Sequence, residues 1–193
     1  MSTEFEPKAG FLQGVRVLEL ADEKGEFAGK ILAGLGAEVV KVEPPGGSST
    51  RRIGPFAEDE HDIENSLFFW HYNVGKKGIT LDFESPSDRD KLVRLAEGAD
   101  VLLETLRPGR LAESGLDYET LRQKNPSLVM LYTCMRGQTG PERKHTGFGI
   151  HGAALGGFIG VTGWKDRKPN MPWGAYTDFI SPRYALSALC AAL

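Results

Sequence analysis

The sequence predicts an α/β fold with a mostly parallel sheet and flanking helices. The apolar pattern switches repeatedly between strand-like and helix-like segments along the chain. Strands that alternate with helices at this spacing imply right-handed βαβ crossovers. The 193 residues are 40% hydrophobic and 25% charged, an ordinary globular composition for a chain long enough to bury one good-sized core.

Short apolar runs mark the expected strands, and longer periodic segments mark the helices between them. Five runs have the strand pattern: residues 15–20, 37–43, 78–83, 100–105 and 128–133. Helical patterns cover residues 26–36, 85–100 and 118–125, with a further helix around 150–158. Gly36 stands where a helix commonly ends on a C′ glycine. A last helix is expected to open with Ser181 as N-cap and Pro182 at its first position.

Ligands of open parallel sheets bind beyond the carboxyl ends of the strands. Basic pairs lie at strand boundaries of this chain, and they are Arg51–Arg52, Lys76–Lys77 and Arg107–Arg110. Each pair suits a phosphate group, and each also fits a solvated surface. The glycines of "LAGLGAEVV" end a helix, so they do not form the dinucleotide fingerprint, which needs glycines between a strand and a helix.

Asp178 is the most unusual acidic residue. It lies between Tyr176 and Phe179, shortly before an apolar helix, so we expect its carboxylate to be partly desolvated. Desolvation makes a carboxylate more basic and more nucleophilic. The residues alone also fit a second interpretation, in which Asp178 serves the electrostatics of a helix N-terminus.

Several classes of function are disfavoured by composition. The net charge of −3 gives no broad basic field for nucleic acid. No apolar run is long enough to span a membrane, and the N-terminus lacks the pattern of a signal peptide, so we expect a cytoplasmic protein. Cys134 and Cys190 are interpreted as buried free thiols. The histidines show no metal-binding spacing, so no metal site is expected. The chain stops inside an apolar helix, which favours a piece of a longer protein.

Several stretches, taken in order, resemble the family III CoA-transferases, also called the CaiB/BaiF family. They are "LQGVRVLEL", "GEFAGKILAGLGAEVVKVEPPGG", "NVGKKGITLDF", "ADVLLETLRPGRLAESGLDYETLRQKNPSLVMLYTC", "GFGIHGAALGGFIGVTG" and "GAYTDFISPRYALSALCAAL". The resemblance implies a Rossmann-like large domain within a two-domain, interlocked homodimer. Residues 1–193 would then be the N-terminal part of the large domain. The small domain and the C-terminal return segment would be absent from this chain.

The resemblance also implies an activity and a set of site residues. Family members move coenzyme A from an acyl-CoA to a carboxylic acid through an aspartyl-CoA thioester, and Asp178 matches the nucleophile. Acyl-CoA would be a substrate, and no tightly bound cofactor is expected. Arg51 and Lys77 are the best matches for CoA binding, and Arg52 and Lys76 are their neighbours. The remaining candidates for this role are Arg107, Arg110, Gly156 and Gly157.

Two departures from the family pattern bear on the site. Pro44-Pro45 stands where several transferases have arginines, which removes one direct contact to CoA. The turn "DEKGEF" replaces the sequence of formyl-CoA transferases, which argues against oxalate or formate as substrate.

Two alternatives stay open beside the transferase. The related α-methylacyl-CoA racemases pair the aspartate with a histidine, and this chain has Phe148 at that place and His151 three residues later. Racemisation is therefore disfavoured. The other alternative is a non-catalytic CoA-binding or assembly module that needs another polypeptide.

Overall fold

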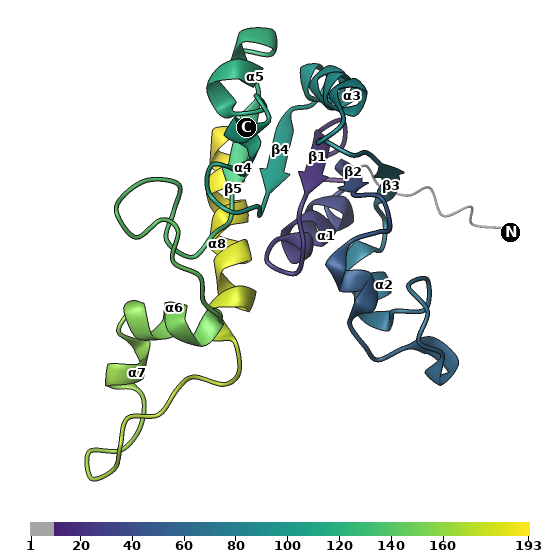
Figure 1. Ribbon diagram of the computed structural model, residues 1–193. Coiled ribbons are helices and arrows are strands. Elements are labelled where there is room, and N and C mark those ends of the chain that lie inside the picture. The colour runs from purple at the N-terminus through teal and green to yellow at the C-terminus, as the bar shows by residue number, and fades with distance from the viewer. Residues whose placement is uncertain (1–9) are drawn as a thin grey trace, which may run out of the picture.

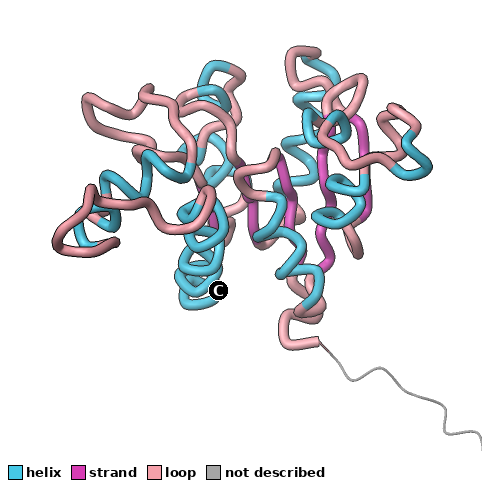
Figure 2. The backbone as a smooth tube through the Cα atoms, turned by 90° about the horizontal axis from the view of Figure 1, so that it is seen from below, coloured by secondary structure: helices cyan, strands magenta, loops and turns pink. Residues whose placement is uncertain are grey.

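A computed structural model describes residues 10–193 as a five-stranded parallel sheet with helices on both faces (Figures 1 and 2). The prediction that the N-terminus is no signal peptide falls mainly on residues 1–9, which lie outside the described residues. The strands are β1 (Arg16–Leu20), β2 (Glu38–Glu43), β3 (Lys77–Thr80), β4 (Val101–Glu104) and β5 (Val129–Tyr132). Their order across the sheet is β3-β2-β1-β4-β5. The predicted α/β class and the mostly parallel sheet are confirmed.

Both faces of the sheet are buried because the strand residues alternate between two cores. Leu18 and Leu102 belong to the core under α3 (Pro86–Glu97), α4 (Arg110–Glu113) and α5 (Tyr118–Lys124). Val17 and Val101 belong to the opposite core, under α1 (Glu26–Gly34) and α8 (Tyr176–Ala192). A parallel sheet covered in this way needs strands that are apolar on both sides.

Helix α1 ends at Gly34, and Gly36 is the predicted C′ glycine after it, with a φ of 101° that favours glycine. The Gly36 N–H donates to the Ala33 carbonyl and the Ala37 N–H to the Leu32 carbonyl, both at 3.0 Å. These two bonds form the Schellman motif that closes many helices.

Other elements differ from the sequence prediction. The predicted third strand ends earlier, at Thr80, and the single helix expected around residues 150–158 is two helices, α6 (Gly149–Leu155) and α7 (Phe158–Val161). Helix α2 (Leu67–Asn73), α4 and two 3₁₀ turns, η1 (Ser49–Arg52) and η2 (Ala57–Asp59), were not predicted. In Figure 1, α6, α7 and the loop after them project away from the sheet.

The start of α8 is the most consequential correction. The helix begins at Tyr176, so Ser181 is not its N-cap and Pro182 lies inside it. Pro182 has no backbone N–H to donate to the Asp178 carbonyl four residues earlier. Asp178 therefore lies in the first turn of α8, where a carboxylate is favoured by the helix dipole, and not in a loop before the helix.

Candidate functional site

Asp178 borders a cavity of about 250 Å³ between the N-terminal part of α8 and three segments from the first half of the chain. Its lining residues are Glu23, Phe27, Ile53, Phe68, Tyr72, Ala175, Asp178 and Phe179. Four of these side chains are aromatic, and none of the described lining residues is a lysine or arginine. The cavity therefore offers a mostly apolar lining with two carboxylates, Glu23 and Asp178.

The N-terminus of α6 approaches Asp178 closely. The Gly149 N–H donates to Asp178 Oδ2 at 3.3 Å, and Thr177 Oγ1 donates to the Gly149 carbonyl at 2.7 Å. A β-carbon at position 149 would lie 2.7 Å from the Ala175 carbonyl and 2.9 Å from Asp178 Cγ. Only glycine permits this approach, and it brings a backbone donor to the carboxylate.

The predicted partial desolvation of Asp178 does not hold for this chain, because the residue is exposed. Its flanking aromatic residues do not cover it, since Phe179 is itself 44% exposed. Asp178 is therefore an accessible carboxylate at the edge of a cavity, and the Gly149 N–H favours its ionised form.

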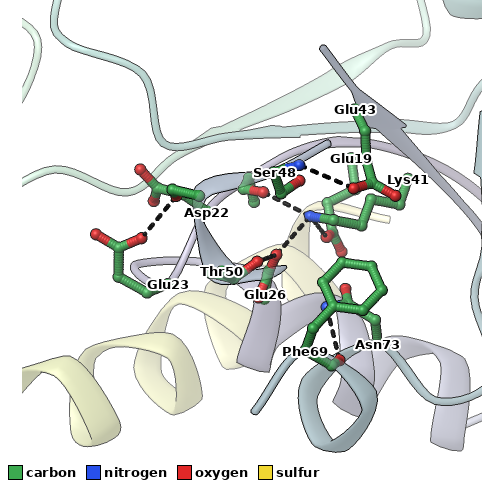
Figure 3. A network of polar contacts seen from close by, with 12 residues as sticks. Glu19, Asp22, Glu23, Glu26, Lys41, Glu43, Ser48, Thr50, Phe69 and Asn73 are labelled. Atoms are coloured by element: carbon green, nitrogen blue, oxygen red, sulfur yellow. Dashed lines mark hydrogen bonds and ion pairs between the residues drawn. The ribbon is translucent and has the colours of Figure 1, made fainter. Parts of the chain in front are cut away.

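Four buried charged side chains, Glu19, Glu26, Lys41 and Lys76, form a network of ion pairs. Figure 3 shows the first three of them. Lys41 Nζ lies 2.7 Å from Glu26 Oε1 and 3.3 Å from Glu19 Oε1, and it also donates to the Ala21 carbonyl at 2.7 Å. Lys76 Nζ lies 2.8 Å from Glu19 Oε2. The side chains of all four residues are at most 2% exposed, so the two lysines balance the two glutamates inside the protein.

Strand register explains how the network forms. Glu19 and Lys41 are direct partners across β1 and β2, and each follows an inward-facing valine by two residues. Gly29 of α1 makes room for them, because a β-carbon there would lie 1.6 Å from Glu19 Oε2. Burial raises the pKa of Glu19 and lowers that of Lys76, and the opposite charges of the network counteract both shifts.

The network reaches the loop and helix that form the cavity wall. Thr50 Oγ1 of η1 donates to Glu26 Oε1 at 2.8 Å, and Lys76 Nζ donates to Asn73 Oδ1 of α2 at 2.9 Å. Ser66 caps α2 by accepting from the Phe69 N–H at 3.1 Å, and its hydroxyl also lies 3.1 Å from the Thr50 carbonyl. Thus η1 and α2 are bound to each other and to the buried charges.

The predicted phosphate-binding arginines of η1 are engaged locally. Arg51 makes two hydrogen bonds to Glu43, at 2.6 and 2.8 Å, and its guanidinium lies 3.8 Å from the centre of the Phe69 ring. Although burial opposes it, hydrogen bonding from Arg51 and Ser48 holds the pKa of Glu43 below its ordinary value. Arg52 is exposed and donates to the Gly46 carbonyl at 3.0 Å.

The two neighbouring lysines point in opposite directions. The Lys76 side chain is 2% exposed and binds Glu19, Asn73 and the Glu26 carbonyl. The Lys77 side chain is 69% exposed and pairs with Glu38 at 2.6 Å. Lys76 lies just before β3 and Lys77 is its first residue, so one lysine is buried where the chain enters the sheet and the other faces solvent.

The last four candidates lie near short helices. Arg107 precedes α4 and Arg110 is its first residue, while Gly156 and Gly157 lie between α6 and α7. Arg107 is exposed and donates to Glu113 at 2.8 Å, whereas Arg110 pairs with Glu84 and lies 5.0 Å from the Phe83 ring centre. Both glycines are exposed, and Gly157 has a φ of 79°. The structure does not gather the three basic pairs into one cluster of side-chain contacts within residues 10–193.

A second cavity, of about 160 Å³, lies at the carboxyl ends of β4 and β5. Glu104 is 3% exposed there, and burial raises its pKa to about 7. Its Oε2 accepts from the Leu106 N–H at 2.6 Å, and Gln138 Nε2 lies 3.4 Å from Oε1. Burial also raises the pKa of Tyr132, in the same wall, to about 12. Sequence reasoning missed Glu104, although it ends a strand of the fully buried type.

The remaining sequence candidates have simple placements. His151 Nδ1 accepts from the Phe148 N–H at 2.9 Å, and both residues are exposed. Cys134 is half-buried as a free thiol, but Cys190 is exposed, so its prediction as a buried thiol is wrong for this chain. No group of three or more potential metal ligands occurs among residues 10–193, and no helix in that range is long and apolar enough to cross a membrane.

The fold and the Asp178 cavity can now be compared with known proteins. A model of the CoA-transferase family III matches residues 12–193. This chain belongs to that family. It is 40% identical to the succinyl-CoA–D-citramalate CoA-transferase of Chloroflexus aurantiacus, over 99% of this chain and 47% of that protein. It is also 40% identical to the succinate–glutarate CoA-transferase of Agrobacterium fabrum, over 94% of this chain and 46% of that protein.

Solved structures agree with the sequence relatives. A CAIB/BAIF family protein from Brucella suis superposes with a TM-score of 0.85 at 35% identity, over 96% of this chain and 49% of that one. The protein Rv3272 of Mycobacterium tuberculosis gives a TM-score of 0.82 at 33% identity, over 95% of this chain and 50% of that one. The chain spans about half the length of the relatives it matches.

Proposed function

We propose that the complete polypeptide transfers coenzyme A between an acyl-CoA and a carboxylic acid, with Asp178 as the nucleophile. The observation that carries this proposal is the position of Asp178 at the edge of an apolar cavity, within hydrogen-bonding distance of a backbone N–H. Membership of the CoA-transferase family supports the general reaction. The relatives that act on succinyl-CoA make dicarboxylic acids reasonable first substrates to test.

The proposed reaction needs no other energy source, because exchanging one thioester for another is nearly isoenergetic. The Asp178 carboxylate attacks the thioester carbonyl, which forms an acyl–aspartyl anhydride and expels CoA as the thiolate. The thiolate attacks the aspartyl carbonyl and releases the donor acid, leaving an aspartyl-CoA thioester. The acceptor carboxylate then reverses these two steps. Backbone donors such as the Gly149 N–H would stabilise the oxyanion formed at Asp178 in the second step.

The basic residues fall into two groups for CoA binding. Arg52 is exposed, and Lys77 and Arg107 form only exposed pairs with Glu38 and Glu113, which water screens and which the phosphates of CoA could replace. Arg51, Lys76 and Arg110 are held in ion pairs, and direct contact with CoA would require those pairs to open. Gly156 and Gly157 remain proposals for close backbone approach. We also propose the interlocked homodimer and the missing second half on the basis of the family resemblance, and the cytoplasmic location stays a prediction.

The proposal is tested in the complete polypeptide with Asp178→Asn and Asp178→Ala, using Asp166→Asn, an exposed loop aspartate, as the matched control. Loss of a covalent nucleophile should lower kcat by at least about 10³-fold. Hydroxylamine added with acyl-CoA should convert position 178 to a hydroxamate, detected by mass spectrometry. Transfer that continues in Asp178→Ala at the normal rate would refute the proposal. Exchange of the α-proton of a 2-methylacyl-CoA would indicate the racemase, and CoA binding without turnover the non-catalytic module.

A further inference from the structure

The four buried charges do not line the cavity, and the proposed reaction at Asp178 gives them no chemical step. Their presence therefore needs another explanation. Four ionised side chains in a core carry a large desolvation cost, and ion pairs compensate it only when their geometry is good. Gly29 adds a further cost, because glycine inside a helix is less favourable than alanine. Its missing β-carbon is what leaves space for the Glu19 carboxylate.

Each of the three first-half segments that line the cavity is attached to the network by a neighbouring residue. Phe27 follows Glu26 directly in α1. Ile53 follows η1, in which Thr50 is fully buried and binds Glu26. Tyr72 precedes Asn73, which accepts a hydrogen bond from Lys76. Figure 3 shows Thr50 and Lys41 converging on the Glu26 carboxylate.

We propose that Glu19, Glu26, Lys41, Lys76 and Thr50 are positioning residues that fix the aromatic wall opposite Asp178. None of them lines the cavity, so their effect on substrate is indirect. Thr50 fixes η1 to the network by its hydrogen bond to Glu26. Ser66 fixes the start of α2 to η1, because its hydroxyl binds both the Thr50 carbonyl and the Phe69 N–H. This inference rests on the proposed function in one respect, which is that the aromatic wall contacts the acyl group of the substrate.

Thr50 offers the sharpest test, because its hydroxyl can be removed without stranding a charge. Thr50→Val keeps the shape but loses the donor to Glu26, whereas Thr50→Ser keeps the donor. Thr80→Val, at an exposed position at the end of β3, is the matched control. All variants are made in the complete polypeptide and measured by amide hydrogen exchange and by steady-state kinetics with acyl-CoA and acid.

A lost hydrogen bond to a charged group should change the local equilibrium by about tenfold or more. Thr50→Val should therefore speed amide exchange about tenfold in residues 49–53 and 67–73 while β4 exchanges as before. The KM for acyl-CoA should rise by a similar factor, with a smaller change in kcat, because the wall is displaced while Asp178 is retained. Thr50→Ser should restore both measurements, and Thr80→Val should change neither.

Three results would overturn this inference. Exchange that accelerates equally in β4 would show that Thr50 serves general stability. Unchanged local exchange would show that the network does not hold η1 and α2, and local acceleration with an unchanged KM would show that the wall does not affect substrate. Failure of the proposed function is recognised separately, because Asp178→Asn would then remain active whatever the exchange experiment shows.

Discussion

The two sides of the sheet treat buried glutamates in different ways. On the β1–β2 side, Glu19 and Glu26 face Lys41 and Lys76, and four opposite charges balance within a few ångströms. On the β4–β5 side, Glu104 has no cation within ion-pair distance in the described part of the chain, and burial raises its pKa to about 7. The comparison shows that burial alone does not decide the charge of a carboxylate. Lys76 and Lys41 oppose the effect of burial on Glu19, although burial still raises its pKa, whereas Glu104 has no such partner at ion-pair distance among residues 10–193.

The largest effect is expected when the balanced side loses one charge. Lys41→Met should lower the free energy of unfolding by about 3–5 kcal/mol, because Glu26 loses its ion-pair cation and Glu19 keeps only Lys76. Urea denaturation of the complete polypeptide measures this. The double variant Lys41→Met/Glu26→Gln is the control, and it should recover part of the loss because it removes one uncompensated charge. A loss below about 1 kcal/mol in the single variant, the size typical of exposed pairs, would contradict the balance described here.

A smaller effect of opposite sign is expected on the β4–β5 side. The folded-state pKa of Glu104 lies above its unfolded value, so the folded protein binds more protons between these two pKa values. Stability should therefore fall as the pH rises from about 4.5 to about 7, by up to about 3 kcal/mol from this residue. Glu104→Gln removes the ionisation and should flatten that fall.

This second prediction is measured by thermal unfolding at pH 5 and pH 8. Glu104→Gln should unfold at a higher temperature than the unmodified protein at pH 8 and at a similar temperature at pH 5. Glu97→Gln, an exposed residue at the end of α3, serves as control and should show no such pH dependence. A variant that is less stable at both pH values would contradict this prediction. It would mean that the hydrogen bond from the Leu106 N–H stabilises the fold more than the buried charge of Glu104 destabilises it.

The smallest effect on stability is expected for the exposed pair of Lys77 and Glu38. The hydrogen bond from Lys77 lowers the pKa of Glu38, but water screens an exposed pair. Lys77→Ala should leave the unfolding curve unchanged within error, in contrast to its buried neighbour Lys76. If Lys77 binds CoA phosphates as proposed, the same variant should raise the KM for acyl-CoA several-fold, and the difference should diminish at high salt.

Much of the fold could be predicted because strands and helices follow the period of apolar residues. The exception at Pro182 has a clear cause. Proline favours the first position of a helix, and the serine before it is a common N-cap. In the structure, however, the helix whose Leu186 and Leu189 pack in the core extends back through Pro182 to Tyr176. Local preference therefore misplaced the start of the one helix that carries Asp178.

The buried network could have been found from sequence, but only by combining two arguments. "VVKVE" has charges at alternate positions and "VRVLEL" contains Glu19, and charges within a strand taken alone indicate a solvent-facing side. A parallel sheet covered on both faces has no such side, so Glu19 and Lys41 had to be buried and paired. The third contributor, Lys76, lies just before a neighbouring strand, and only the three-dimensional structure shows which of the two adjacent lysines turns inward.

The Asp178 cavity is assembled from two separate pieces of chain. Phe68 and Tyr72 come from the first half, and Asp178 comes from the last helix. Replacing Phe68 or Tyr72 would reshape the cavity without removing Asp178 or its contact with Gly149, whereas replacing one charge of the network is expected to leave its partner buried without a counter-ion. A protein organised in this way can diversify its ligands during evolution through the aromatic positions, while its charged interior must be inherited as a unit.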